Sequence, residues 1–243
     1  ELGPQGTVAL LNEYFTIMVE CIQREGGMLD KFIGDAIMAA FGMPLPKGDD
    51  EDHAVRAAIA MLRDLAQFNQ ERVNHGLKPV DMGIGLNTDT VVSGNIGSPK
   101  RMDFTLIGDG VNLASRLESA CKQYYAKILI SEYTYKRLKG TYRIREVDRV
   151  VVKGKTEPVG VLEVLDHYTE EDFPSIMEVV NYFGDGVKCY REQKLDKAVN
   201  FFKKVLSLHP GDELSRMYIQ RCEMMKVNPP GPEWDGVWVM DRK

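Results

Sequence analysis

Apolar positions in the first 75 residues follow a helical period that is interrupted once by a strand-like segment. The spacing predicts one helix over residues 2–24 and a second over residues 51–75. Between them, residues 29–41 are apolar on both sides of Gly34-Asp35, which predicts two strands joined by a tight turn. A carboxylate is therefore expected at the tip of this hairpin.

The middle of the chain is dominated by short β-type segments. Residues 80–95 predict a second hairpin, and the glycines in it predict bulges or a close approach of the backbone. A turn and a helix follow at 108–121, and further β-rich segments lie at 127–131, 142–152 and 159–165. Alternating helices and strand pairs predict an α+β domain, with helices on one face of a largely antiparallel sheet.

Composition changes after His167, and helical spacing then returns. The change predicts a first domain over 1–166, a linker over 167–177, a helical element over 178–226 and a tail over 227–243. We expect the rings of Trp234 and Trp238 to dock this tail.

The helical element contains a spaced pattern that resembles a tetratricopeptide repeat. An ordinary helical hairpin is the alternative. A single repeat cannot bury its faces alone, so the element is expected to pack on the first domain or on a partner copy. The pattern consists of Gly186, Ala198, Phe202 and Pro210.

Bulk composition excludes several classes of function. A formal net charge of −5 offers no electrostatic basis for binding nucleic acid. No apolar stretch approaches the roughly 20 residues that span a bilayer, so no membrane association is expected in this segment. The four cysteines are widely spaced and match no zinc motif, which favours reduced thiols in a cytoplasmic protein.

Two segments carry the candidate chemistry: residues 30–41, with Lys31 and Asp35, and residues 104–116, with Thr105, Asn112 and Arg116. Together they resemble the catalytic domain of class III nucleotidyl cyclases, over roughly residues 2–165. The resemblance implies a ferredoxin-like domain that converts ATP to 3′,5′-cyclic AMP and pyrophosphate.

The resemblance also implies a metal site. Asp35 matches the second of two family aspartates that hold two Mg²⁺ or Mn²⁺ ions. The first belongs to an Asp-Ile-x-x-Phe-Thr motif on a strand before the first helix, and these 243 residues do not contain that motif. It is expected upstream of residue 1, and the chain as given is expected to lack full activity.

The other matched residues would bind and activate the nucleotide. Lys31 and Thr105 match the purine-reading pair and indicate ATP, because ammonium can donate to adenine N1 and hydroxyl can accept from the N6 amine. The Thr variant resembles the bicarbonate-responsive branch of adenylate cyclases. In the family, Asn112 would orient the ribose, Arg116 would stabilise phosphate charge, and Lys153 would bind the β- and γ-phosphates.

The resemblance further implies a homodimer with shared active sites, Asp35 serving one site and the remaining residues the other. Three alternatives stay open: a non-catalytic nucleotide-sensing or dimerisation domain, a guanylate cyclase, and a diguanylate cyclase. A diguanylate cyclase would carry a Gly-Gly-Asp/Glu-Glu-Phe run at the hairpin, where this chain has Ile33 to Ile37. The C-terminal helices are a candidate surface for a protein partner.

Overall fold

The computed structural model describes residues 3–151, 158–231, 234 and 236–237. The helices at 2–24 and 51–75 and the hairpin at 29–41 are confirmed, each boundary within one residue. The elements, in chain order, are α1 (Gly3–Arg24), β1 (Met28–Ile33), β2 (Ala36–Ala40), α2 (Asp50–Asn74), β3 (Ile84–Leu86), β4 (Val92–Ser98), β5 (Arg101–Ile107), α3 (Asp109–Tyr124), β6 (Ile128–Ser131), α4 (Glu132–Tyr135), β7 (Ile144–Val151), β8 (Pro158–Val164), α5 (Ile176–Arg191), α6 (Leu195–Leu208) and α7 (Glu213–Val227).

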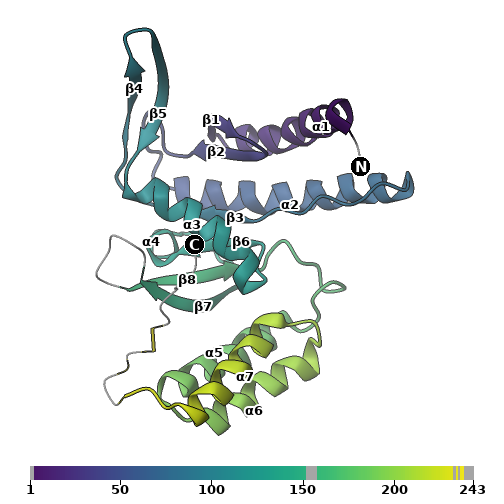
Figure 1. The fold of residues 1–243 in the computed structure, drawn as a ribbon, viewed down its shortest axis with the longest axis vertical. Coiled ribbons are helices and arrows are strands. Elements are labelled where there is room, and N and C mark those ends of the chain that lie inside the picture. Colours follow the sequence, from purple (N-terminus) through teal and green to yellow (C-terminus); the bar gives the residue numbers. More distant parts are fainter. Residues whose placement is uncertain (1–2, 152–157, 232–233, 235, 238–243) are drawn as a thin grey trace.

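A four-stranded sheet with the order β3-β6-β8-β7 lies at the centre of the molecule. β3 runs parallel to β6, and the other two pairings are antiparallel. The remaining strands form two separate hairpins, β1–β2 and β4–β5. Figure 1 shows the central sheet between α1 and α2 on one side and α5, α6 and α7 on the other, with the β4–β5 hairpin projecting as an arm. The predicted α+β class is confirmed.

Helices cover both faces of the central sheet, so the prediction of helices on one face is wrong. In β6, Ile128 and Ile130 pack in one core with α1 and α2. Leu129, between them, packs in a second core with α3, α5, α6 and α7. The physical reason is visible in β6 and β8, which are apolar at nearly every position: a strand that is apolar on both sides needs cover on both faces.

The predicted hairpin over residues 80–95 is also wrong. β3 joins the central sheet beside β6, whereas β4 pairs with β5 and places Gly94 opposite Thr105. In the connection after β3, the side-chain amide of Asn87 donates to the backbone oxygen of Gly110 at the start of α3, at 3.0 Å. Two apolar segments adjacent in sequence therefore pair with different neighbours.

The C-terminal helices dock on the sheet through buried charges. Arg145 of β7 donates to Glu163 of β8 and to Asp212 just before α7, each at 2.7 Å, and all three side chains are buried. Despite its burial, Asp212 has a lowered pKa because of the charge of Arg145 and the hydrogen bonds of Ser215. The prediction that the helical element packs on the first domain is confirmed.

A second buried group ties α7 to α3. Asp148 of β7 accepts from Arg221 of α7 at 2.7 Å and from the hydroxyl of Tyr124 of α3 at 2.9 Å. Removing one partner of a buried ion pair strands the other charge at a cost of about 3–5 kcal/mol. These contacts therefore fix how α7 lies relative to α3.

Two contacts show how α5 packs against α6 and how the tail packs against α5. A Cβ at Gly186 would lie 2.6 Å from the ring of Phe202, so the small residue of α5 makes room for the aromatic residue of α6. Trp234 packs edge-on against Tyr190 with ring centroids 5.2 Å apart, as expected for a docked tail. Trp238 lies outside the described residues.

All four cysteines are free thiols, as predicted, and burial raises the pKa of the Cys21 and Cys222 thiols to about 11. Within the described ranges, no helix has the length and apolar character needed to cross a bilayer.

His167, which follows β8, should make the free energy of unfolding depend on pH. Burial lowers the pKa of His167 to about 4, whereas an unfolded histidine titrates near about 6.5. Between these values the unfolded chain binds the proton and the folded chain does not, so stability falls on acidification through this window. Urea unfolding at pH 7, 6 and 5 should show a smaller loss for His167→Gln than for the wild type.

The exposed histidine of the α2 C-terminus provides the control. His75→Gln should keep the wild-type dependence on pH. An identical pH dependence for wild type and His167→Gln would contradict this account.

Candidate functional site

Strand β1 contains an irregularity at Asp30 that brings two neighbouring side chains together. Leu29 pairs with Ala39 of β2 but Lys31 pairs with Met38, so Asp30 is an extra residue in the ladder. In a regular strand, adjacent side chains point to opposite faces. A bulge relaxes that rule and re-aims the side chains beside it.

The buried carboxylate of Asp30 lies between the two predicted purine-reading residues. Thr105 Oγ1 of β5 donates to Asp30 Oδ2 at 3.2 Å, and Lys31 Nζ lies 3.5 Å from the same oxygen. The Asp30 side chain is 0% exposed, whereas that of Lys31 is 36% exposed. The structure therefore brings Lys31 and Thr105 together from two different hairpins.

Asp30 was not predicted as a site residue. Its signal in the sequence is an acidic residue beside Lys31 in an otherwise apolar strand. That pattern alone does not reveal a bulge, because it is equally typical of a solvated strand.

Asp35 lies at the β1–β2 turn, as the hairpin pattern predicted. Gly34 before it has a φ of 64°, a left-handed conformation that glycine adopts without strain. Asp35 is exposed and lines a cavity of about 460 Å³ between β2 and β3, which is also lined by residues of α1, α2 and α3. Burial, followed by the negative charge of Asp35, raises the pKa of Tyr14 in the same cavity.

Asn112 and Arg116 are both exposed on α3, one turn apart. The helix rests directly on β3, because a Cβ at Gly85 would lie only 2.2 Å from the backbone oxygen of Ala114. The predicted close approach of the backbone is confirmed at Gly85, but not at Gly94, where nothing lies within 4 Å of a Cβ. α3, which carries Asn112 and Arg116, therefore lies closer to β3 than any side chain at position 85 would permit.

The described residues do not make up a complete metal site. No group of three or more His, Cys, Asp or Glu side chains among them could hold a metal ion. Asp35 offers one carboxylate, so a two-ion site does not fit the described residues alone. The predicted phosphate ligand Lys153 lies outside the described residues.

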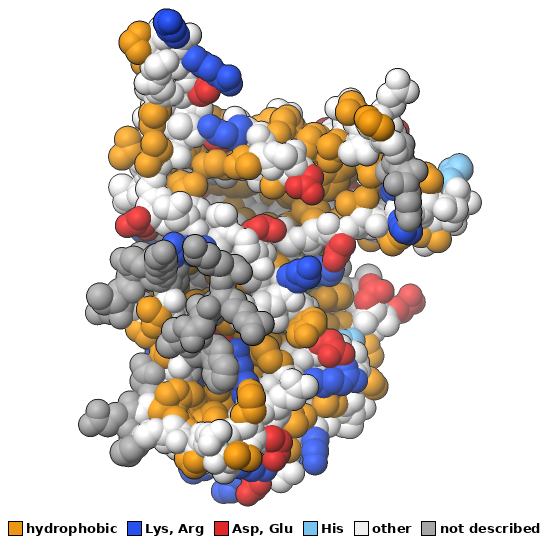
Figure 2. All heavy atoms as spheres, viewed as in Figure 1, with side chains coloured by type: hydrophobic (Ala, Val, Ile, Leu, Met, Phe, Trp, Pro, Cys, Tyr) orange, Lys and Arg blue, Asp and Glu red, His pale blue; other side chains and the backbone are white. Residues whose placement is uncertain are grey.

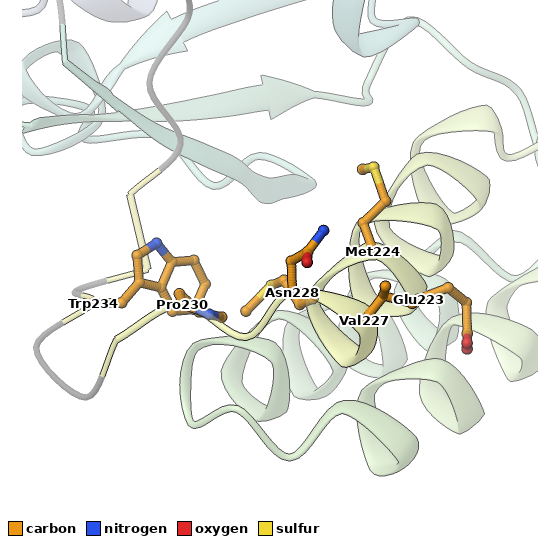
Figure 3. Close-up of a pocket in the computed structure, with 7 residues that line it drawn as sticks. Glu223, Met224, Val227, Asn228, Pro230 and Trp234 are labelled. Carbon is orange, nitrogen blue, oxygen red and sulfur yellow. The ribbon is translucent and has the colours of Figure 1, made fainter.

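A second cavity of about 550 Å³ lies at the C-terminal end of α7. Figure 3 shows Met224, Val227 and Trp234 around it, with Asn228 and Pro230 between them. None of the predicted site residues lines this cavity. It lies between the C-terminal end of α7 and the tail rather than at the hairpins and α3.

Comparison with known proteins agrees with this arrangement. Residues 1–165 match the family model described as the adenylate and guanylate cyclase catalytic domain. A terminal-differentiation-specific adenylate cyclase of Dictyostelium discoideum is 37% identical over 222 residues, which are 88% of this chain and 10% of that protein. An adenylate cyclase of Anabaena cylindrica is 42% identical over 161 residues, 63% of this chain and 31% of that protein. The chain thus spans a third or less of these relatives.

Solved structures include both nucleotide specificities. The adenylyl cyclase CyaB from P. aeruginosa matches with a TM-score of 0.63 and 37% identity, over 71% of this chain and 87% of that one. The guanylyl cyclase Cya2 matches with a TM-score of 0.59 and 38% identity, over 67% of this chain and 81% of that one. Similarity to these two solved structures alone therefore does not distinguish the two nucleotides, whereas both relatives named above are adenylate cyclases.

The contact between α3 and β3 gives a direct test of how the site is positioned. Gly85→Ala should push α3 away from β3 and lower the free energy of unfolding by about 1–3 kcal/mol, the usual cost of overpacking. Gly94→Ala is the matched control, since nothing lies within 4 Å of a Cβ there. Thermal or urea unfolding measures both. Equal stabilities for the two variants would mean that α3 does not need the glycine.

Proposed function

Because the chain belongs to the family of adenylate and guanylate cyclase catalytic domains, we propose that it converts ATP to 3′,5′-cyclic AMP and pyrophosphate. The ribose 3′-oxygen loses its proton and attacks the α-phosphorus, and the bond from that phosphorus to the pyrophosphate oxygen breaks. The observation that carries the choice of ATP is the contact of Lys31 and Thr105 with one carboxylate oxygen.

The chemistry of the adenine edge supports this pairing. Lys31 can donate to adenine N1 and Thr105 can accept from the N6 amine. Guanine presents the opposite pattern, a donor at N1 and an acceptor at O6. Guanylate cyclase activity is therefore the less favoured alternative, although a guanylyl cyclase is among the structural neighbours.

Residues on α3 would act on the sugar and the phosphates. Asn112 would orient the ribose, and Arg116 would bond two phosphate oxygens at once through its planar guanidinium, which stays charged throughout. Both side chains are exposed, so a nucleotide can reach them. Lys153 would bind the β- and γ-phosphates.

A divalent-ion site, with two Mg²⁺ or Mn²⁺ ions, would need ligands beyond those described. Asp35 would supply one carboxylate, the triphosphate would supply oxygens, and the family's first aspartate would supply another. The cavity beside Asp35 separates β2 from β3, and in the described residues neither strand pairs across it. When bound, the ions would neutralise phosphate charge.

A homodimer with shared sites is supported by exposed apolar side chains on the two hairpins. Phe32 and Ile33 of β1 are exposed, as are Val92, Met102 and Phe104 of the β4–β5 arm. Figure 2 shows hydrophobic side chains over the upper half of the molecule, where these hairpins lie together with α1 and α2. Apolar surface of this kind marks interaction sites.

The proposal also covers the domain boundaries, the C-terminal helical element and the cellular location of the protein. We place the cyclase domain at 1–166, a linker at 167–177, a tetratricopeptide-like element at 178–226 and a tail at 227–243. The packing of Gly186 against Phe202 supports that pattern. Bicarbonate sensitivity, a protein partner for the helices and a cytoplasmic location remain predictions from the sequence.

A non-catalytic nucleotide-sensing or dimerisation domain is the second candidate. It is favoured by one observation, the lack of a three-ligand metal group within the described residues. The two candidates differ in turnover and share nucleotide binding.

Turnover is tested by incubating the natural full-length protein with ATP and Mn²⁺ and measuring cyclic AMP. We expect cyclic AMP from the wild type and a kcat lower by about 100-fold or more in Arg116→Ala, the usual loss when one preorganised charge donor is removed. Lys122→Ala, another exposed cation of α3, should keep the wild-type kcat. Nucleotide binding without any cyclic AMP would favour the non-catalytic candidate.

Sharing of sites between protomers is tested by mixing two inactive variants. Asp35→Ala and Arg116→Ala chains should each be inactive, whereas their heterodimer retains one site with both residues intact. Cyclic AMP formation should return on mixing. If a heterodimer confirmed by mass measurement stays inactive, each site belongs to one chain.

A further inference from the structure

Asp30 is a buried charged group that the proposed roles of Lys31 and Thr105 do not use. Its Oδ2 accepts from Thr105 and lies near Lys31, while its Oδ1 has no hydrogen-bond partner among the described residues. A carboxylate buried with one unpartnered oxygen costs free energy.

A threonine hydroxyl is ambiguous as a recognition group. It has one proton to donate and two lone pairs that accept, and it rotates to suit its partner. Unconstrained, it could accept from the N6 amine of adenine or donate to O6 of guanine. By itself, Thr105 would discriminate poorly between the two bases.

The carboxylate removes that ambiguity. An ionised carboxylate only accepts, so the hydrogen bond of 3.2 Å requires the Thr105 hydroxyl to donate its proton to Asp30. Its lone pairs then point away from Asp30. We propose that Asp30 is a specificity-determining residue that fixes Thr105 as an acceptor and thereby selects 6-aminopurine nucleotides over 6-oxopurine nucleotides.

The backbone explains how Asp30 reaches this position. The bulge in β1 relaxes the alternation of side chains, so that Lys31 Nζ lies 3.5 Å from the Oδ2 of the adjacent Asp30. Gly94 lies opposite Thr105 in the β4–β5 ladder, with nothing within 4 Å of where a Cβ would stand, so the surface beside the hydroxyl is open. The inference rests on the proposed function, because it assigns Thr105 to the purine edge.

The main test compares nucleotide selectivity, which a merely structural role would not change. The ratio of kcat/KM for ATP to that for GTP is measured in the full-length protein. In Asp30→Asn, the side-chain amide can donate to Thr105 and release the hydroxyl proton toward O6. The ratio should fall by about tenfold, the worth of one hydrogen bond. An unchanged ratio would overturn the proposal.

Two further variants separate Thr105 from Lys31 and from general damage. In a Thr105→Val background no hydroxyl remains, so adding Asp30→Asn should leave the ratio unchanged. A further fall there would assign the effect to Lys31 and refute the role given to Thr105. Asp103→Asn makes the same substitution at an exposed position of β5 and should leave the wild-type ratio intact.

A pair of analogues tests the unaltered protein, whatever the stability of the variants. N6-methyl-ATP and the triphosphate of 6-methoxypurine riboside are similar in size and keep N1 as an acceptor for Lys31. They differ in presenting a donor or an acceptor at position 6. A fixed acceptor should bind N6-methyl-ATP about tenfold more tightly, whereas a rotating hydroxyl should bind both equally.

Binding of these analogues is measured by calorimetry and needs no turnover. Absence of any cyclic nucleotide from ATP would refute the proposed activity without deciding the role of Asp30. Equal binding of the two analogues would refute the role of Asp30 even in an active cyclase.

Discussion

The arrangement of the molecule depends on a central sheet that is apolar on both faces. Strands β6 and β8 alternate between two cores, so each face must be covered by helices. α1 and α2 take one face, while α3 and the C-terminal helices take the other. This double cover sets the place of α3, and with it the exposed side chains of Asn112 and Arg116. The β1–β2 and β4–β5 hairpins lie outside the sheet and are joined to each other at Asp30 and Thr105.

The pattern of apolar residues predicted most helices and strands, but it did not predict which strands pair with each other. Periodicity located α1, α2 and the β1–β2 hairpin to within one residue. It misassigned β3 and β4, because apolar alternation describes a strand without naming its neighbour. β3 pairs with β6, and the same segment contacts α3 through Gly85, which admits the backbone of the helix, and through Asn87, which donates to Gly110. Such tertiary contacts leave no periodic signal in the sequence.

Some features of the candidate site could likewise be predicted from the sequence, and others could not. Resemblance to the cyclase family singled out Lys31, Asp35, Thr105, Asn112 and Arg116 by residue type and spacing. The meeting of Lys31 and Thr105 around one oxygen is a property of the fold, and Asp30 was missed because its burial depends on a bulge and on a second hairpin. The fit of a metal also depends on more than the matched residue, since Asp35 is a single carboxylate without a ligand cluster in the described part of the chain.

Composition changes after His167, but buried ion pairs join the segments before and after this residue. Asp148 holds Arg221 of α7 and Tyr124 of α3 at once, and Arg145 holds Asp212. A chain cut between β8 and α5 would leave two charged groups of β7, Arg145 and Asp148, without their partners from the C-terminal segment. The segment with α5, α6 and α7 thus completes the core that lies against β7. Local unfolding of α7 would remove Arg221 from Asp148, which also holds Tyr124 at the C-terminal end of α3. Such unfolding would therefore affect the helix that carries Arg116.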